Sequence, residues 1–164
     1  MHYIKGMKTH EKTLGKIDSA LIGWMTKNGI SLLRISIGLI FFWFGILKFF
    51  EGLSPAEDLA TRTISAITFN LVPDKVIIYG LAAWEVLIGV GLIFNIFMRV
   101  TLFLLFLQML GTFFPLFLFP GEIFHVFPVS LTLEGQYIIK NIVIISGGIV
   151  LGSTLRPARL YHGH

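Results

Sequence analysis

Four stretches of the sequence are long enough and apolar enough to cross a membrane as helices. They comprise residues 29–50, 76–98, 100–119 and 137–155. A span needs about 20 residues, because the hydrocarbon core of a bilayer is about 30 Å thick and an α-helix rises about 1.5 Å per residue. The sequence lacks the shorter, alternating segments of a membrane barrel. It therefore predicts an all-α integral membrane protein, a bundle of four transmembrane helices.

The low content of charged residues supports this prediction and excludes other classes of protein. Only 13% of the 164 residues are charged and 55% are hydrophobic, whereas soluble domains have about 25% charged residues. Such a chain cannot cover a soluble core, and we expect no binding to nucleic acid. The sequence contains no cysteine, which excludes disulfides and thiolate redox or metal sites.

The distribution of positive charge predicts how the helices are oriented. Lys and Arg are concentrated in residues 1–28 and 156–164, and the connections after the first and third spans hold most of the acids. By the positive-inside rule, both termini are expected in the cytoplasm, as in a multi-pass protein of the cytoplasmic membrane. The chain then divides into a basic amphipathic cytoplasmic segment (1–28), a transmembrane domain (29–155) and a basic cytoplasmic tail (156–164).

The segment 1–28 has two interpretations. Ile17, Leu21 and Trp24 recur at helical spacing close to Lys16 and Lys27. This pattern is typical of a helix that lies on a leaflet rich in anionic lipid. The alternative is a basic lead-in that only fixes the topology.

Both outer connections carry signals of local structure. Ser54, Pro55 and Glu57 form the start signature of a helix, so a short extra-membrane helix is expected in the first connection. The third connection is apolar and rich in proline over residues 115–128. Pro115 removes a backbone donor, so the third span is expected to bend or stop there. The connection is then expected to lie on, or re-enter, the outer face of the bundle.

Each span carries its small and polar residues along one face. In the first span Arg34, Gly38, Phe41, Gly45 and Lys48 are separated by four and three residues in turn, which places them on one side of a helix. Small residues allow membrane helices to approach closely, so these stripes are expected to face the interior of the bundle. The stripes of the other spans are Ala82, Glu85 and Gly89; Thr101, Leu104, Gln108, Gly111 and Pro115; and Tyr137, Lys140, Ile144, Gly147 and Leu151.

The polar members of these stripes predict a pocket within the membrane. Glu85 lies about 13 Å from the outer end of its span and Gln108 about 12 Å from the inner end of its own, so both are near mid-membrane. An acid at this depth costs about 2.5–3.5 kcal/mol on insertion scales and needs a cation, water or a proton. Lys48 or Lys140 could reach Glu85 if the span boundaries shift by a few residues; otherwise a neutral Glu85 would bond to Gln108. The candidate ligand-binding residues are Glu85, Lys48, Lys140, Gln108 and Arg34.

This pocket is expected to open outward and to take a small ligand, a quinone head group or a proton. The alternative is that both lysines extend to the membrane surface and that Glu85 only helps to pack the helices. The five histidines lie outside the spans, so we expect no metal site. Because the sequence has no phosphate loop, nucleophile elbow or suitable carboxylate pair, we assign no catalytic residue and do not expect an independent enzyme.

Short motifs with a familiar pattern extend over most of the chain, from about residue 31 to residue 152. Those of the first two spans are Leu33–Ile35, Gly38–Gly45, Lys48–Phe50 and Trp84–Gly89. They resemble the DoxX-like membrane proteins. The similarity is closer to the YkgB branch of that family, the reactive chlorine resistance membrane proteins of bacterial inner membranes. The stretches similar to this branch are Leu53–Ala60, Gly111–Phe113 and Leu131–Asn141.

The resemblance implies an inner-membrane protein of oxidative or reactive chlorine stress, with Arg34, Lys48, Glu85 and Lys140 in the pattern of the branch. Wider DoxX-like relatives include subunits of membrane oxidoreductases, some of them linked to quinone. Three hypotheses follow: a stress-resistance protein that binds a small molecule or a partner, a quinone-interacting oxidoreductase subunit, and a structural scaffold. No cofactor is expected for the first and a quinone for the second. The expected partners are the lipid bilayer and either a redox protein or a second copy of the chain.

Overall fold

The chain divides into two units, Met1–Leu33 and Arg34–His164. The computed structural model describes residues 2–50, 52–54 and 57–155, and the side chains from residue 15 onward. The predicted tail 156–164, Pro55 of the predicted helix start and the side chains of the first basic residues lie outside this description.

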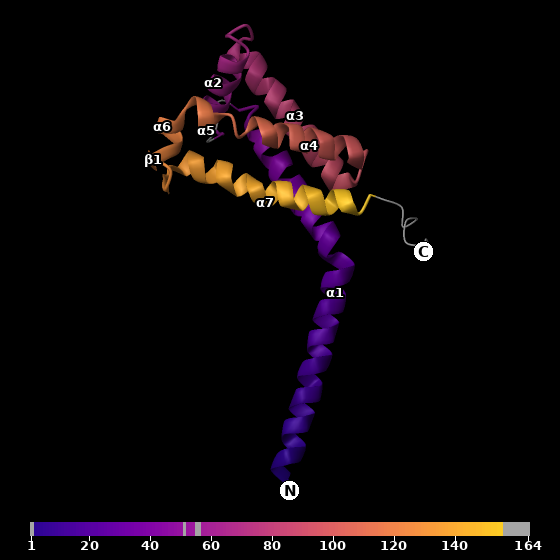
Figure 1. Ribbon diagram of the computed structural model, residues 1–164. Helices are drawn as coiled ribbons and strands as arrows, with labels where there is room; N and C mark the ends of the chain where they lie inside the picture. The colour runs from indigo at the N-terminus through magenta and orange to yellow at the C-terminus, as the bar shows by residue number, and fades with distance from the viewer. Residues whose placement is uncertain (1, 51, 55–56, 156–164) are drawn as a thin grey trace, which may run out of the picture. The chain divides into compact units, whose positions relative to one another are not determined.

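Long helices dominate the structure (Figure 1). They are α1 (His2–Leu47), α3 (Asp74–Phe94), α4 (Met98–Gly111) and α7 (Leu133–Ser153). Within the described residues, four segments are long and apolar enough to cross a membrane, which confirms the predicted all-α membrane bundle. They are Gly15–Leu47, Asp74–Phe94, Met98–Leu118 and Leu133–Ser153.

Helix α1 extends well before the predicted first span and forms the whole N-terminal unit. Ile17, Leu21 and Trp24 are each more than half exposed in this unit, at 53%, 52% and 57%. Thr26 and Asn28 bond to carbonyls four residues back in the same helix, at 2.8 and 2.9 Å. The segment is therefore helical, and both interpretations of it, a helix on a lipid surface or a lead-in that fixes the topology, stay predictions.

A tight turn joins α3 to α4 and ends α3 earlier than the predicted residue 98. Asn95 has the left-handed conformation (φ 59°), and the amide of Ile96 donates to the carbonyl of Gly91 at 2.9 Å. Asn tolerates this conformation better than most residues. The turn reverses the chain, so α3 and α4 pack side by side.

The predicted interruption at Pro115 is confirmed. Helix α4 ends at Gly111, and the carbonyl of Gly111 accepts from the amide of Phe114 at 3.2 Å. Pro115 has no amide to continue the α-helical ladder. It instead begins the four-residue helix α5 (Pro115–Leu118).

Helix α7 begins four residues before the predicted boundary at residue 137. The hydroxyl of Thr132 accepts from the amide of Gly135 at 3.1 Å, which caps the helix start. The predicted inward stripe of this span is correct at its C-terminal end, where Gly147 and Leu151 are buried. It is wrong at the other end: Tyr137 and Lys140 are exposed. The buried residues there are Gly135 and Ile138 instead.

Glycines bring α1 and α3 into close contact, as the small-residue stripes predict. A Cβ on Gly45 would lie 2.8 Å from the amide nitrogen of Val86, and one on Gly89 would lie 2.5 Å from that of Phe42. No side chain larger than hydrogen fits at either position without moving backbone. The close approach of the two helices therefore brings side chains at the end of α1 within reach of α3.

The remaining elements form a cap at one end of the bundle. The cap consists of α2 (Glu57–Ile67), α5, α6 (Pro120–Ile123) and a hairpin of β1 (Phe124–Val126) and β2 (Ser130–Leu131). The strands are antiparallel and pair Phe124 with Leu131 and Val126 with Ser130. The cap core contains Leu59, Ile123 and Ile138, with Phe113, Leu116, Phe119, Phe124 and Leu131 packed against it. The short helix α2 was predicted, and the hairpin was not.

Candidate functional site

Glu85 lies at the middle of the 21-residue helix α3 and is buried, with 9% of its surface exposed. Glu85 packs directly against Gly45 of α1. A Cβ added to Gly45 would lie 2.9 Å from Glu85 Cβ. The carboxylate therefore lies between α1 and the rest of the bundle. This is the inward orientation that the stripe predicts.

Two side chains from outside α3 bind the two oxygens of Glu85. Lys48 Nζ lies 2.6 Å from Oε2, and Gln108 Nε2 donates to Oε1 at 2.6 Å. The sequence offered these contacts as alternatives, and the structure makes both at once. We call Lys48, Glu85 and Gln108 the polar triad. Bonds to both oxygens are what a buried carboxylate requires, because unmet hydrogen bonds in a low-dielectric interior are costly.

Lys48 reaches Glu85 from just beyond the end of α1. Helix α1 ends at Leu47, and Lys48 follows in a turn, with 7% of its surface exposed. Its aliphatic stem therefore extends back along the bundle rather than out to the membrane surface. The alternative that both lysines extend to the surface is wrong for Lys48.

The polar triad retains hydrogen-bonding capacity. Gln108 Oε1 is buried, and among the side chains that the structure describes none donates to it. Lys48 also has three N–H donors, of which one bond goes to Glu85. The triad is thus able to bind one more donor at Gln108 and further acceptors at Lys48.

A second polar contact links the remaining long helix to this region. Asn141 of α7 donates to the hydroxyl of Thr112 at 3.1 Å, and Thr112 donates to the carbonyl of Met109 at 2.7 Å. Thr112 follows Gln108 by one turn, so the two share a face. Thr112 and Asn141 lie outside the predicted stripes. The i, i+4 spacing of Gln108 and Thr112 is the signal that would have found the first of them.

A small hollow lies beside the exposed end of the triad. It is lined by Lys48, Lys75, Ile78 and Tyr79 and has a volume of about 20 Å³. This is room for about one water molecule. A larger ligand would therefore require the helices to part from the observed conformation.

Arg34 lies apart from the triad and binds the end of α3. Its Nη1 donates to the carbonyl of Leu92 and, at 2.8 Å, to that of Ile93. Both carbonyls are in the last turn, where backbone acceptors lack helical partners and the helix dipole favours a cation. The structure thus gives Arg34 a capping contact, which explains its place in the first-span stripe.

Replacing Arg34 by leucine is expected to destabilise the protein by about 1.5–3 kcal/mol, the usual contribution of hydrogen bonds from a charged group. The free energy of unfolding in detergent or bicelles would measure the loss. Arg99 is exposed and serves as the matched control. Equal effects of Arg34→Leu and Arg99→Leu would contradict the capping role.

Lys140 also lies apart from the triad. It is exposed, and its Nζ is 5.6 Å from the centre of the Tyr137 ring of the same helix. A cation over an aromatic face is a weak local contact. The structure therefore brings together three of the five candidate residues, and their binding of a ligand stays a prediction.

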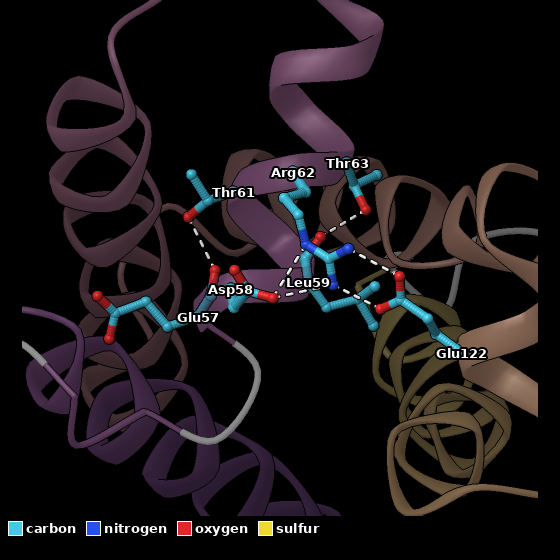
Figure 2. A network of polar contacts seen from close by, with 7 residues as sticks. All are labelled: Glu57, Asp58, Leu59, Thr61, Arg62, Thr63 and Glu122. Atoms are coloured by element: carbon cyan, nitrogen blue, oxygen red, sulfur yellow. Dashed lines mark hydrogen bonds and ion pairs between the residues drawn. The ribbon is translucent and has the colours of Figure 1, made fainter.

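An ionic network that the sequence did not indicate joins the two connections of the cap (Figure 2). Arg62 of α2 donates to both oxygens of Glu122 of α6, at 2.7 and 2.5 Å, and its Nε donates to Asp58 at 2.9 Å. Its guanidinium also lies 5.3 Å from the centre of the Phe119 ring. The bidentate contact fixes the orientation of α2 against α6.

The hydrogen bonds from Arg62 lower the pKa of Glu122 below its ordinary value of 4.5. A carboxyl group with a lowered pKa stabilises the fold above its ordinary pKa and loses that contribution as the pH falls through the folded value. We expect the NMR titration midpoint of Glu122 to lie below 4.5 in the native protein and to rise in Arg62→Gln. An unchanged midpoint in that variant would contradict the pairing.

One comparison with known proteins identifies the family. The sequence model of the DoxX family matches residues 29–119, more than half of the chain. The match includes all three residues of the polar triad. No curated protein and no solved structure matches the chain.

Proposed function

Because the chain belongs to the DoxX family of membrane proteins, we propose that it protects a bacterium against oxidative and reactive chlorine stress. In this proposal it belongs to the YkgB branch, lies in the inner membrane and has both termini in the cytoplasm. The branch is supported by the motifs Leu53–Ala60, Gly111–Phe113 and Leu131–Asn141. The orientation is supported by the excess of Lys and Arg at both ends of the chain.

The protective function would act through the polar triad, which binds a small molecule or a partner group. The observation that carries the proposal is a buried ion pair, Lys48–Glu85, with the unsatisfied acceptor Gln108 Oε1 beside it. Apolar side chains would pack helices at lower cost than buried charges do. Ionisable groups within membrane spans therefore most often serve function.

Survival of hypochlorous acid tests this proposal. A strain that depends on the protein would carry either the native chain or Glu85→Gln, which keeps the shape of the side chain and removes its charge. We expect survival to fall to the level of the strain without the protein, at equal protein abundance in the membrane. Glu134→Gln, in the first turn of α7, is the matched control. Unchanged survival with Glu85→Gln would favour a structural scaffold over a binding protein.

A second candidate is a membrane subunit that binds quinone for an oxidoreductase. The observation that favours it is again Gln108 Oε1, a buried acceptor suited to a quinol hydroxyl. The small hollow counts against it, since a quinone ring needs far more than about 20 Å³. We expect quinone in lipid extracts of the purified native protein, and less of it in Gln108→Leu, only if this candidate is correct.

A further inference from the structure

The hairpin of the cap ends in an apolar tip formed by Val126, Phe127, Pro128 and Val129. Val126, Phe127 and Val129 are 63%, 73% and 84% exposed. Large apolar side chains exposed together on a tight turn are unusual on a surface that faces water. The tip therefore needs a partner that covers it.

The base of the hairpin is firmly held, so the tip is presented in a defined place. Ile123, at the start of the hairpin, is fully buried in the cap core, and Leu131 packs against the same core. Thr132 donates its amide to the carbonyl of Ile123 at 2.9 Å, which closes the base. The exposed tip is thus the end of an anchored element.

The backbone of the tip is suited to leaving water. The amide of Val129 donates to the carbonyl of Val126 at 2.9 Å, and Pro128 has no amide. Both features reduce the number of donors that must be desolvated in an apolar environment. The sequence between Glu122 and Glu134 contains no Lys, Arg, Asp or Glu to oppose insertion, and its one histidine, His125, precedes the tip.

The tip is continuous with the apolar surface of the two spans that flank it. The third candidate span ends at Leu118 and the fourth begins at Leu133. Phe117 and Leu133 are 81% and 58% exposed at these ends. Val129 can lie no more than about 14 Å from Leu133 along an extended chain, so the tip is within reach of the bilayer that contains the spans.

We propose that this tip is a membrane anchor: Val126, Phe127 and Val129 insert into the interfacial region of the lipid bilayer at the cap end of the bundle. The lipid holds the cap, through the hairpin, over the end of the bundle. A second copy of the chain is the competing occupant of the same surface. Continuity with the lipid-facing ends of two spans favours the bilayer.

The absence of native cysteine allows a direct test by site-directed spin labelling. Val129→Cys and Phe127→Cys would each be labelled with a nitroxide in vesicles of phosphatidylcholine and phosphatidylglycerol. Gly80→Cys, where an added Cβ meets open space within the α3 span, reports lipid. Asp58→Cys, at a side chain that is 82% exposed, reports water.

We expect the tip labels to collide more often with oxygen than with a water-soluble nickel chelate, as the Gly80 label does, and the Asp58 label to show the reverse. Tip labels that behave like the Asp58 label would overturn the proposal. So would spin–spin broadening at the tip that disappears when labelled protein is diluted with unlabelled protein, because that result assigns the surface to a second copy.

Discussion

Replacing Lys48 by leucine is expected to lower the free energy of unfolding by about 3–5 kcal/mol, because it leaves Glu85 buried without its cation. Lys48 Nζ lies 2.6 Å from Glu85 Oε2, and 8% and 12% of the two side chains are exposed. Removing one partner of a buried ion pair lowers the free energy of unfolding far more than replacing both partners by apolar residues of similar volume. Reversible unfolding in mixed micelles would measure the change.

A double replacement separates the lost pair from lost packing. Lys48→Leu combined with Glu85→Leu removes both charges, so it is expected to be closer to the native stability than Lys48→Leu alone. Lys75→Leu is the matched single control, since Lys75 is an exposed lysine beside the same hollow. Equal losses of unfolding free energy in Lys48→Leu and Lys75→Leu would show that Lys48 does not compensate a buried carboxylate.

Replacing Gly89 by leucine is expected to cost about 3 kcal/mol or more, the upper end of what overpacking costs. A Cβ at this position would lie 2.5 Å from the amide nitrogen and 2.7 Å from the Cα of Phe42. Backbone atoms cannot rotate away, so α1 and α3 must separate. The yield of folded protein and its unfolding free energy would both fall.

Gly80→Leu is the matched control for Gly89→Leu, because it makes the same change on the same helix where an added Cβ meets open space. It is expected to be neutral or slightly stabilising, since leucine favours a helix more than glycine does. Equal unfolding free energies of the two variants would show that α1 and α3 do not approach closely at Gly89. The separation of these helices also sets the Lys48–Glu85 distance, so Gly89→Leu is expected to impair the proposed function as well.

The sequence predicted the spans and the inward-facing stripe of the first helix because both depend on local features. Span length follows from bilayer thickness, and the stripe with Gly45 follows from helical periodicity. Glu85 and Gln108 were expected at similar depth, and the structure joins them at 2.6 Å. Lys48 was a harder prediction, because its reach depends on where α1 ends.

The misplaced residue Lys140 has a physical explanation. The two ends of α7 pack against different neighbours: the C-terminal part packs against α4, where a Cβ on Gly148 would lie 3.1 Å from the Phe106 ring. The N-terminal part instead packs against the cap core, which buries Ile138 on another face of the helix and leaves Tyr137 and Lys140 exposed. A single stripe along the whole span therefore cannot describe the buried face of a helix that packs against different elements at its two ends.

Other features were beyond the sequence because they depend on contacts between distant segments. Arg62 and Glu122 lie in different connections and meet only when the cap folds. The hairpin pairs short strands that carry little periodic signal, and its base depends on Ile123 packing with Leu59 and Ile138. Arg34 was a pocket candidate by its spacing, whereas its partners are backbone carbonyls, which no sequence pattern reveals.

The central claim is that Glu85 pairs with Lys48 inside the bundle, and one distance measurement tests it directly. Solid-state NMR of protein in lipid, with ¹⁵N-lysine and ¹³C-glutamate, reports the dipolar coupling between Lys48 Nζ and Glu85 Cδ. We expect a strong coupling, since Nζ lies 2.6 Å from Oε2, and its loss in Glu85→Ala. A Lys48 Nζ that couples to lipid phosphate and to no glutamate carboxyl would contradict the claim.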